Sequence, residues 1–470
     1  MADDSSLHFK TITEVAKLIE SKQISPVELT SHMLSRIESL DARFKSYVTV
    51  MADHALAAAR SAEQEIQRGA YRGALHGVPI AVKDLCFTKG VRTMGGTKSL
   101  ASNIPDFDAT VVAKFDVAGA VLLGKLNLTE GAMGGYNPEF DIPVNPWGAD
   151  RWSGASSSGS GVATAAGLCF GSLGSDTGGS IRFPAAACGV VGLKPTWGRV
   201  SRYGVLALAE SLDHVGPLTR SSADAGMVLQ AIAGHDPNDP TSLPDAVPDM
   251  LNGIDQGVKG VRIGLDERYV SNDVNSELSE AVLAGVRILE AQGAEIVDVH
   301  LPDMEEYLSA WPTLCSAEAV AAHEATYPSR RDEYGPWFRD WLDLGASITG
   351  AAYAKANNLR TASNGQLRQV FQDIDVLACP SMPEPPFQIN PNWLYGPIED
   401  DGLDMSLLRF TAPFDFNGAP TISLPCGLNN EGLPLSLQFV GKHLQEPLLC
   451  RIGHTYEQVT DWHEATPPID

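Results

Sequence analysis

Two glycine-rich tracts that carry serines, together with one lysine, supply the groups in this sequence that could do chemistry. The first tract is Gly154-Ala155-Ser156-Ser157-Ser158-Gly159-Ser160-Gly161, and the second is Gly174-Ser175-Asp176-Thr177-Gly178-Gly179-Ser180-Ile181-Arg182. Lys83 ends an apolar run that begins at Gly77, and no histidine lies near either tract in the sequence. A serine hydroxyl group needs an adjacent base to become nucleophilic, and Ser–Lys pairs are an alternative to Ser–His pairs. The residues therefore indicate a hydroxyl nucleophile, a hydroxyl relay and an amine base.

Each feature also has a structural interpretation. Gly/Ser stretches are most often loops or linkers, but the first tract runs directly into the apolar segment 162–168, which favours burial. The two glycines before Ser180 could present backbone N–H groups to an oxyanion, or form an ordinary turn or a phosphate loop. A lysine at a strand end usually extends into solvent. If Lys83 is buried beside hydroxyl groups instead, its pKa falls and its neutral amine can act as a base.

Other catalytic templates are absent from the sequence. It contains no G-x-S-x-G, S-x-x-K or H-E-x-x-H pattern and no Walker spacing. An α/β-hydrolase elbow, a penicillin-recognising serine site and a nucleotide loop are therefore unsupported. The scattered histidines argue against a catalytic metal, so we expect neither a metal nor another cofactor.

The composition narrows the class of protein. The chain has 470 residues, 44% of them hydrophobic, which suffices for a sizeable core. A net charge of −24 disfavours nucleic acid and anionic membranes as partners. The seven cysteines include no C-x-x-C pair and are typical of a reduced chain. With no visible signal peptide or membrane-spanning stretch, we expect a cytoplasmic protein that binds neither nucleic acid nor membrane.

The elements expected around these residues alternate between strands and helices. The first 70 residues read as helical, with capping boxes at Thr11–Glu14 and Ser25–Glu28 and a third helix over Asp53–Gln67. The next expected elements, in chain order, are a strand at Val78–Val82, a helix at Ala109–Val117, strands at Val121–Leu123 and Val261–Gly264, a helix at Ser276–Gln292, strands at Glu295–Val299, Val376–Cys379, Thr421–Leu424 and Leu435–Val440, and a closing helix from Pro447 to about Trp462. Such alternation favours an α/β protein with a largely parallel sheet.

Several segments together resemble the amidase signature family. They are Gly77–Asp84, Gly124–Glu130, Gly154–Thr196, Gly418–Gly427 and Gly432–Gly441. The resemblance spans nearly the whole chain and implies one compact domain with a mixed, largely parallel sheet covered by helices on both faces. Residues 1–70 would form N-terminal helices, 75–220 a signature core with the catalytic residues, and 221–470 the remaining α/β part and a variable pocket wall.

The resemblance also implies a role for individual residues. Ser180 corresponds to the nucleophile, Lys83 to the base, and Ser156 to a relay serine that follows a cis peptide bond; the spacing to Ser180 selects Ser156 over Ser157 or Ser158. The N–H groups of Thr177, Gly178, Gly179 and Ser180 would form the oxyanion hole, while Asp176 and Arg182 would stabilise the nucleophile loop. The segment with Met133, Gly134 and Tyr136 resembles the substrate-pocket wall, as do 311–327, 334–341 and the proline-rich residues 380–400. Ala155 departs from the glycine that relatives usually have.

The expected activity is hydrolysis of the C–N bond of a small amide through an acyl-enzyme. The substrate class stays open among aryl amides, other small amides and carbamates or urethanes, and the protein could be a monomer or a homodimer. The alternative is an ammonia-releasing glutaminase that acts with partner subunits, like the amidotransferase component that feeds ammonia to a tRNA-bound partner. That component typically has glutamine where this chain has Phe183, which disfavours the alternative. A catalytically silent protein of the same fold is the third possibility.

Overall fold

The computed structural model describes residues 7–398 and 405–469, in which eleven strands form one sheet. Their order is β1-β3-β2-β4-β6-β5-β10-β11-β9-β7-β8. The strands are β1 Tyr47–Val50, β2 Pro79–Lys83, β3 Val121–Leu126, β4 Gly171–Asp176, β5 Val191–Lys194, β6 His214–Thr219, β7 Arg262–Leu265, β8 Glu295–Asp298, β9 Val376–Pro380, β10 Thr421–Leu428 and β11 Pro434–Gly441.

The sheet is mixed, as expected for this α/β fold. Strands β3, β2 and β4 pair in parallel, as do β9, β7 and β8. Antiparallel pairing through β6, β5, β10 and β11 joins these two groups. Strands β10 and β11, from near the end of the chain, thus lie in the middle of the sheet.

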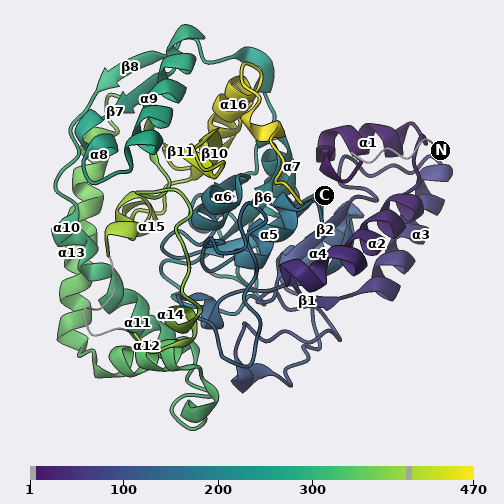
Figure 1. Cartoon of the computed structure of the whole chain (residues 1–470), viewed down its shortest axis with the longest axis horizontal. Helices are drawn as coiled ribbons and strands as arrows, with labels where there is room; N and C mark the ends of the chain where they lie inside the picture. The colour runs from purple at the N-terminus through teal and green to yellow at the C-terminus, as the bar shows by residue number, and fades with distance from the viewer. Residues whose placement is uncertain (1–6, 399–404, 470) are drawn as a thin grey trace.

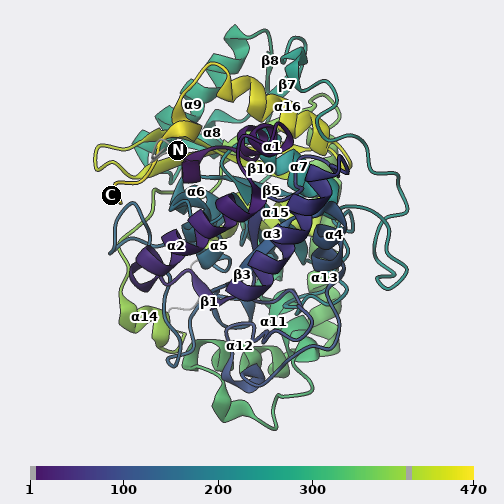
Figure 2. The ribbon, with the colours of Figure 1, turned by 90° about the vertical axis from the view of Figure 1, so that its right-hand side faces the viewer.

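Helices cover the sheet. They are α1 Ile12–Glu20, α2 Pro26–Phe44, α3 Ala52–Gln67, α4 Thr110–Ala118, α5 Ser158–Ala165, α6 Arg182–Cys188, α7 Ser222–Ile232, α8 Glu267–Ser271, α9 Ser276–Ala291, α10 Glu305–Leu308, α11 Ala310–Ala322, α12 Pro336–Ser347, α13 Gly350–Val370, α14 Pro391–Tyr395, α15 Ala412–Phe416 and α16 Glu446–Glu457. Figure 1 shows α1–α3 at one side of the molecule and α11–α13 at the other. Figure 2 shows α2 and α3 from the side, in front of the end of the sheet that holds β1 and β3.

The local sequence signals agree with the helix ends. Both predicted capping boxes form, at Thr11 with Glu14 and at Ser25 with Glu28. Gly119 ends α4 in the left-handed conformation, with φ +74°. One expected region differs: within the first 70 residues the chain also forms β1, because Tyr47–Val50 pairs antiparallel with β3. None of the helices in the described residues is both long and apolar enough to span a membrane.

The sheet brings the chemistry-bearing residues to one place. Strand β2 ends at Lys83, and its parallel neighbour β4 ends at Asp176, directly before the second tract. Helix α5 begins at Ser158, immediately after Ser156 and Ser157, and packs against β4. The ends of adjacent parallel strands meet at one edge of a sheet, so the lysine and both tracts converge.

Candidate active site

Lys83 is fully buried among three serine hydroxyl groups. Its Nζ atom lies 2.6 Å from Ser156 Oγ and 2.9 Å from the Oγ atoms of Ser157 and Ser175. Burial lowers the pKa of Lys83 to about 7, although the negative charge of Asp176 opposes the shift. The lysine therefore does not extend into solvent, and a substantial fraction of it is a neutral amine at neutral pH.

The two serines next to Lys83 in the first tract differ in their surroundings. The Ala155–Ser156 peptide bond is cis, as the family resemblance implied. Ser157 is tied to β4: its hydroxyl group donates to the Ser175 carbonyl oxygen and accepts from the Ser175 N–H, both at 3.2 Å. The hydroxyl group of Ser156 has Lys83 as its partner in the described residues. Ser156 is therefore the freer of the two to exchange a proton.

The second tract forms a loop whose backbone is held by one carboxylate. Asp176 accepts from the N–H of Gly179 at 2.7 Å and from the N–H of Ile181 at 3.0 Å. Gly179 has φ +135°, and a Cβ atom there would lie 2.4 Å from the Phe183 ring, so this position requires glycine. Because Asp176 takes the Gly179 N–H, this expected oxyanion-hole donor is already engaged.

Ser180 follows in this loop. Its backbone carbonyl oxygen accepts from the Ser157 N–H at 3.4 Å, which joins the two tracts. Ser180 also lines the main cavity together with Ala155, Thr177 and Gly178. Its hydroxyl group makes no hydrogen bond to any residue in 7–398 or 405–469. The hydroxyl group is thus available at the wall of a cavity, beside the tract that holds Ser156.

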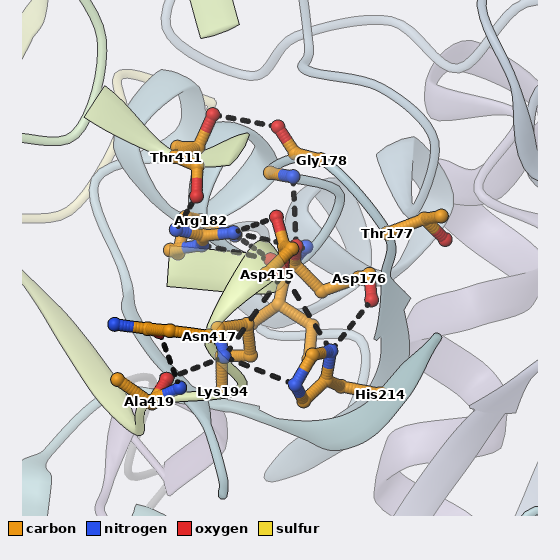
Figure 3. Close-up of polar contacts among 12 residues, drawn as sticks. Asp176, Thr177, Gly178, Arg182, Lys194, His214, Thr411, Asp415, Asn417 and Ala419 are labelled. Atoms are coloured by element: carbon orange, nitrogen blue, oxygen red, sulfur yellow. Dashed lines mark hydrogen bonds and ion pairs between the residues drawn. The ribbon is translucent and has the colours of Figure 1, made fainter. Parts of the chain in front are cut away.

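A buried ion cluster supports the loop from behind, as Figure 3 shows. The Arg182 guanidinium lies 2.8 Å from Asp176 Oδ1 and 2.7 Å from Asp415 Oδ2, and all three side chains are fully buried. Arg182 also donates to the Thr411 carbonyl oxygen at 2.9 Å. Burial by itself would raise the pKa of Asp176, but the positive charge of Arg182 and the hydrogen bonds that Asp176 accepts lower that pKa by more. The Asp176 carboxyl group therefore stays ionised. The structural role expected for Asp176 and Arg182 fits this arrangement.

Lys194 and His214 complete the cluster. Lys194 Nζ donates to the Ala419 carbonyl oxygen at 2.6 Å and lies 3.2 Å from His214 Nε2. Burial holds the pKa of His214 well below its usual value, so the ring is neutral. With Nε2 accepting from Lys194, the Nδ1–H group donates to the Asp176 carbonyl oxygen at 3.2 Å.

The main cavity has a volume of about 460 Å³ and a largely apolar wall that includes six aromatic side chains. Its aromatic lining residues are Trp152, Phe183, Trp311, Trp337, Phe387 and Trp393. The Trp152 ring stacks on Phe387 with centroids 4.8 Å apart and tilts against Phe183 at 5.8 Å. Such a wall favours an apolar, flat group in the ligand.

The structure corrects two expectations about this wall. Met133 and Gly134 line the cavity, but Tyr136 does not: it is buried, and its hydroxyl group donates to Ser158 Oγ at 2.7 Å. Trp311 and Trp337 line the cavity as expected, whereas Trp341 is fully buried behind them. In the described part of the chain, no group of His, Cys, Asp and Glu side chains is placed to hold a metal ion.

Sequence reasoning missed several residues of the site. Asp415 and Thr411 come from a segment far along the chain, and neither belongs to a motif that signalled a role. Ser175 and Lys194 stand inside matched segments, so their positions were visible but their contacts were not. His214 carried no signal in the sequence.

Comparisons with known proteins identify the family to which this chain belongs. A family model described as Amidase matches residues 28–450. "Putative amidase AmiD" from Mycobacterium tuberculosis is 46% identical, over 99% of this chain and 98% of its own. The crystal structure of a bacterial aryl acylamidase of the amidase signature family has a TM-score of 0.87 at 26% identity, over 97% of this chain and 98% of its own. The chain therefore belongs to the amidase signature family.

The same family includes proteins that act within larger enzymes. One component of the glutamyl-tRNA(Gln) amidotransferase of Desulfatibacillum aliphaticivorans is 38% identical to this chain, over 99% of this chain and 100% of its own. Membership of the family is therefore compatible with two functions, that of a hydrolase and that of an amidotransferase component.

Proposed function

We propose that this protein is a serine-dependent amidohydrolase that cleaves small amides carrying an aryl or other flat apolar group. The observation that carries the proposal is the contact between Lys83 and Ser156, 2.6 Å, beside a Ser180 that lines an aromatic cavity. A buried amine with a pKa of about 7 suits a general base at neutral pH. The match to the Amidase family model supports the same class of reaction.

The proposed acylation step uses Lys83, Ser156 and Ser180 in sequence. Neutral Lys83 accepts the Ser156 proton while Ser156 accepts the Ser180 proton, and Ser180 Oγ forms a bond to the substrate carbonyl carbon. The oxyanion is bound by the N–H groups of Gly178, Ser180 and Thr177, each worth about 2.7–4 kcal/mol in comparable sites. The Gly179 N–H, which already donates to Asp176, is left out of this set.

The remaining steps return the proton. As the C–N bond breaks, the Lys83 ammonium group donates through Ser156 to the leaving nitrogen, which departs as an amine. Water then attacks the acyl-enzyme carbonyl and gives a proton to the same relay. The bond to Ser180 breaks, Ser180 regains its proton, and a carboxylic acid leaves.

The cavity wall guides the substrate proposal. Six aromatic side chains line it, and Glu384 is its charged lining residue. Anilides and other aryl amides fit such a wall best, and aryl carbamates present the same flat group. The resemblance to an aryl acylamidase structure points in the same direction.

The second candidate is an ammonia-releasing glutaminase with partner subunits, which the 38% identity to the amidotransferase component favours. Glutamine is small and polar, however, and Phe183 contributes an apolar ring to the cavity where that component typically has glutamine. We therefore rank this function second, and expect the purified chain to act alone on a small molecule.

A fluorophosphonate probe and a substrate panel test the proposal. The wild-type protein should be labelled and the Ser180→Ala variant should not, while Ser160→Ala should still be labelled. Ser160 lies in the first tract but donates to the Leu173 carbonyl oxygen instead of contacting Lys83. Labelling of Ser180→Ala would overturn the mechanism. The purified protein should hydrolyse anilides faster than aliphatic amides or glutamine; a preference for glutamine would favour the second candidate.

A further inference from the structure

Trp311 contacts the backbone of the nucleophile loop at the position where the proposed oxyanion hole begins. It lies in the first turn of α11 and is 3% exposed. Its indole Nε1–H donates to the Thr177 carbonyl oxygen at 3.0 Å. The indole ring also covers Gly178 so closely that a Cβ atom there would lie 2.6 Å from the ring atom Cζ2. Trp311 is therefore more than a part of the cavity wall.

The hydrogen bond fixes the direction of one peptide plane. In a trans peptide the C=O and the following N–H point in opposite directions, and the Thr177–Gly178 bond is not among the cis bonds of the described chain. With the Thr177 carbonyl oxygen held by Trp311, the Gly178 N–H faces away from the indole N–H. No residue in the described ranges accepts from this N–H group.

The next peptide plane is fixed in the same way by another segment. The Gly178 carbonyl oxygen accepts from Thr411 Oγ1 at 2.6 Å, and the following N–H, that of Gly179, donates to Asp176. Two successive peptide planes are thus pinned through their carbonyl groups. Of the N–H groups in these two planes, that of Gly179 donates to Asp176, and that of Gly178 remains available to a ligand.

We propose that Trp311 is a positioning residue that sets the orientation of the oxyanion-binding Gly178 N–H. This inference rests on the proposed acyl-transfer function. If the Thr177–Gly178 plane rotated, it would turn the negative end of the Thr177 carbonyl dipole toward the developing oxyanion. Electrostatic stabilisation of this kind depends on donors that are oriented before the reaction. The indole N–H supplies that orientation from a helix distant in sequence.

Trp341 offers a matched control. Its ring centroid lies 5.8 Å from that of Trp311, and it is fully buried in the same aromatic layer. Its Nε1–H has no hydrogen-bond partner in the described chain, and Trp341 does not line the cavity. Replacement of either indole removes the same atoms, but only at Trp311 is a hydrogen bond to the nucleophile loop lost.

The test compares Trp311→Phe with Trp341→Phe on an anilide substrate. We expect Trp311→Phe to lower kcat by about 10- to 100-fold, below the effect of removing a whole oxyanion donor, with KM changed less than about threefold. The Trp341→Phe variant should stay within about threefold of the wild type in both kcat and KM. Binding of a trifluoromethyl ketone, which forms an oxyanion on Ser180, should weaken in step with kcat in the Trp311 variant alone.

An isosteric replacement separates the loss of the hydrogen bond from effects on folding or on the shape of the cavity. Incorporating benzothienylalanine at position 311 replaces the indole N–H by sulfur at nearly unchanged shape and should reproduce the loss in kcat. The inference is overturned if this replacement leaves kcat unchanged, or if the loss appears only in KM. Failure of the proposed function is distinguishable, because it would appear as labelling of Ser180→Ala, whatever the Trp311 variants do.

Discussion

Lys83 Nζ lies 2.6 Å from Ser156 Oγ, and both residues are fully buried. An ammonium group could donate to all three serines around it, but only the neutral amine can accept a proton from Ser156. The protonation state of one buried lysine therefore decides whether the proposed relay can work.

The rate of acylation should follow the ionisation of Lys83. Burial lowers the pKa of Lys83 to about 7, so the amine is charged and inactive below that pH and neutral above it. The rate of fluorophosphonate labelling should rise about tenfold per pH unit below pH 6 and level off above pH 8. Lys83→Met should remove this dependence along with most of the activity. A labelling rate that stays flat between pH 6 and 8 would exclude Lys83 as the base.

The two serines beside Lys83 should differ in their effect on turnover. Ser156→Ala breaks the relay and should lower kcat/KM by about 10²–10⁴-fold, the usual contribution of general acid–base catalysis. Ser157 instead bonds to the Ser175 backbone, so Ser157→Ala should cost about tenfold or less. Steady-state kinetics on one anilide measure both. An equal loss in the two variants would assign the relay to Ser157 as well.

Phe183 should control the preference for aryl substrates. Its ring lines the cavity and packs against Trp152, and burying such a side chain is worth about 1.5–3 kcal/mol. Phe183→Ala should therefore raise KM for an anilide by about 10- to 100-fold. A short aliphatic amide, which cannot reach the ring, serves as the control and should change by less than about threefold. Equal losses on both substrates would mean that Phe183 acts on the loop rather than on the substrate.

Asp415 should contribute strongly to stability. It is fully buried and accepts from Arg182, which keeps Asp176 as a second partner, and loss of a hydrogen bond to a charged group typically costs about 1.5–3 kcal/mol. Asp415→Ala should lower the free energy of unfolding by that amount, measured by denaturant titration. Asp375→Ala is the control, because Asp375 is 30% exposed and pairs with an Arg262 that is 38% exposed. The loss of that surface pair should cost about 1 kcal/mol or less.

Several elements of the fold could be predicted from the sequence, because their signals are local. Among those that position the site, β2 was predicted, whereas β4, α5 and α6 were not. Capping boxes at Thr11 and Ser25, a glycine after α4 and apolar runs at β2 and β3 act within a few residues. The proximity of Lys83 to the first tract followed from a family resemblance, not from the residues alone. Its three hydroxyl partners became visible only in the structure.

The remaining contacts depend on packing between distant segments. Asp415 contacts Arg182 because α15 packs near the loop that follows β4, and Trp311 reaches Thr177 from α11. No periodicity or motif near residues 311 or 415 indicates these contacts. Tyr136 was misplaced for a related reason: its hydroxyl group donates to Ser158 Oγ, 22 residues further along the chain, a contact that residue types do not disclose.

The position of β10 in the sheet has a consequence for biosynthesis. Strand β5 pairs with β10, and the segment just before β10 supplies the Thr411 and Asp415 contacts to Arg182. While the chain is being translated, the loop with Ser180 and Arg182 leaves the ribosome long before these partners do. A nascent chain that ends before residue 411 therefore lacks these contacts to Arg182, and residues 176–182 gain their full set of partners only when the last strands enter the sheet.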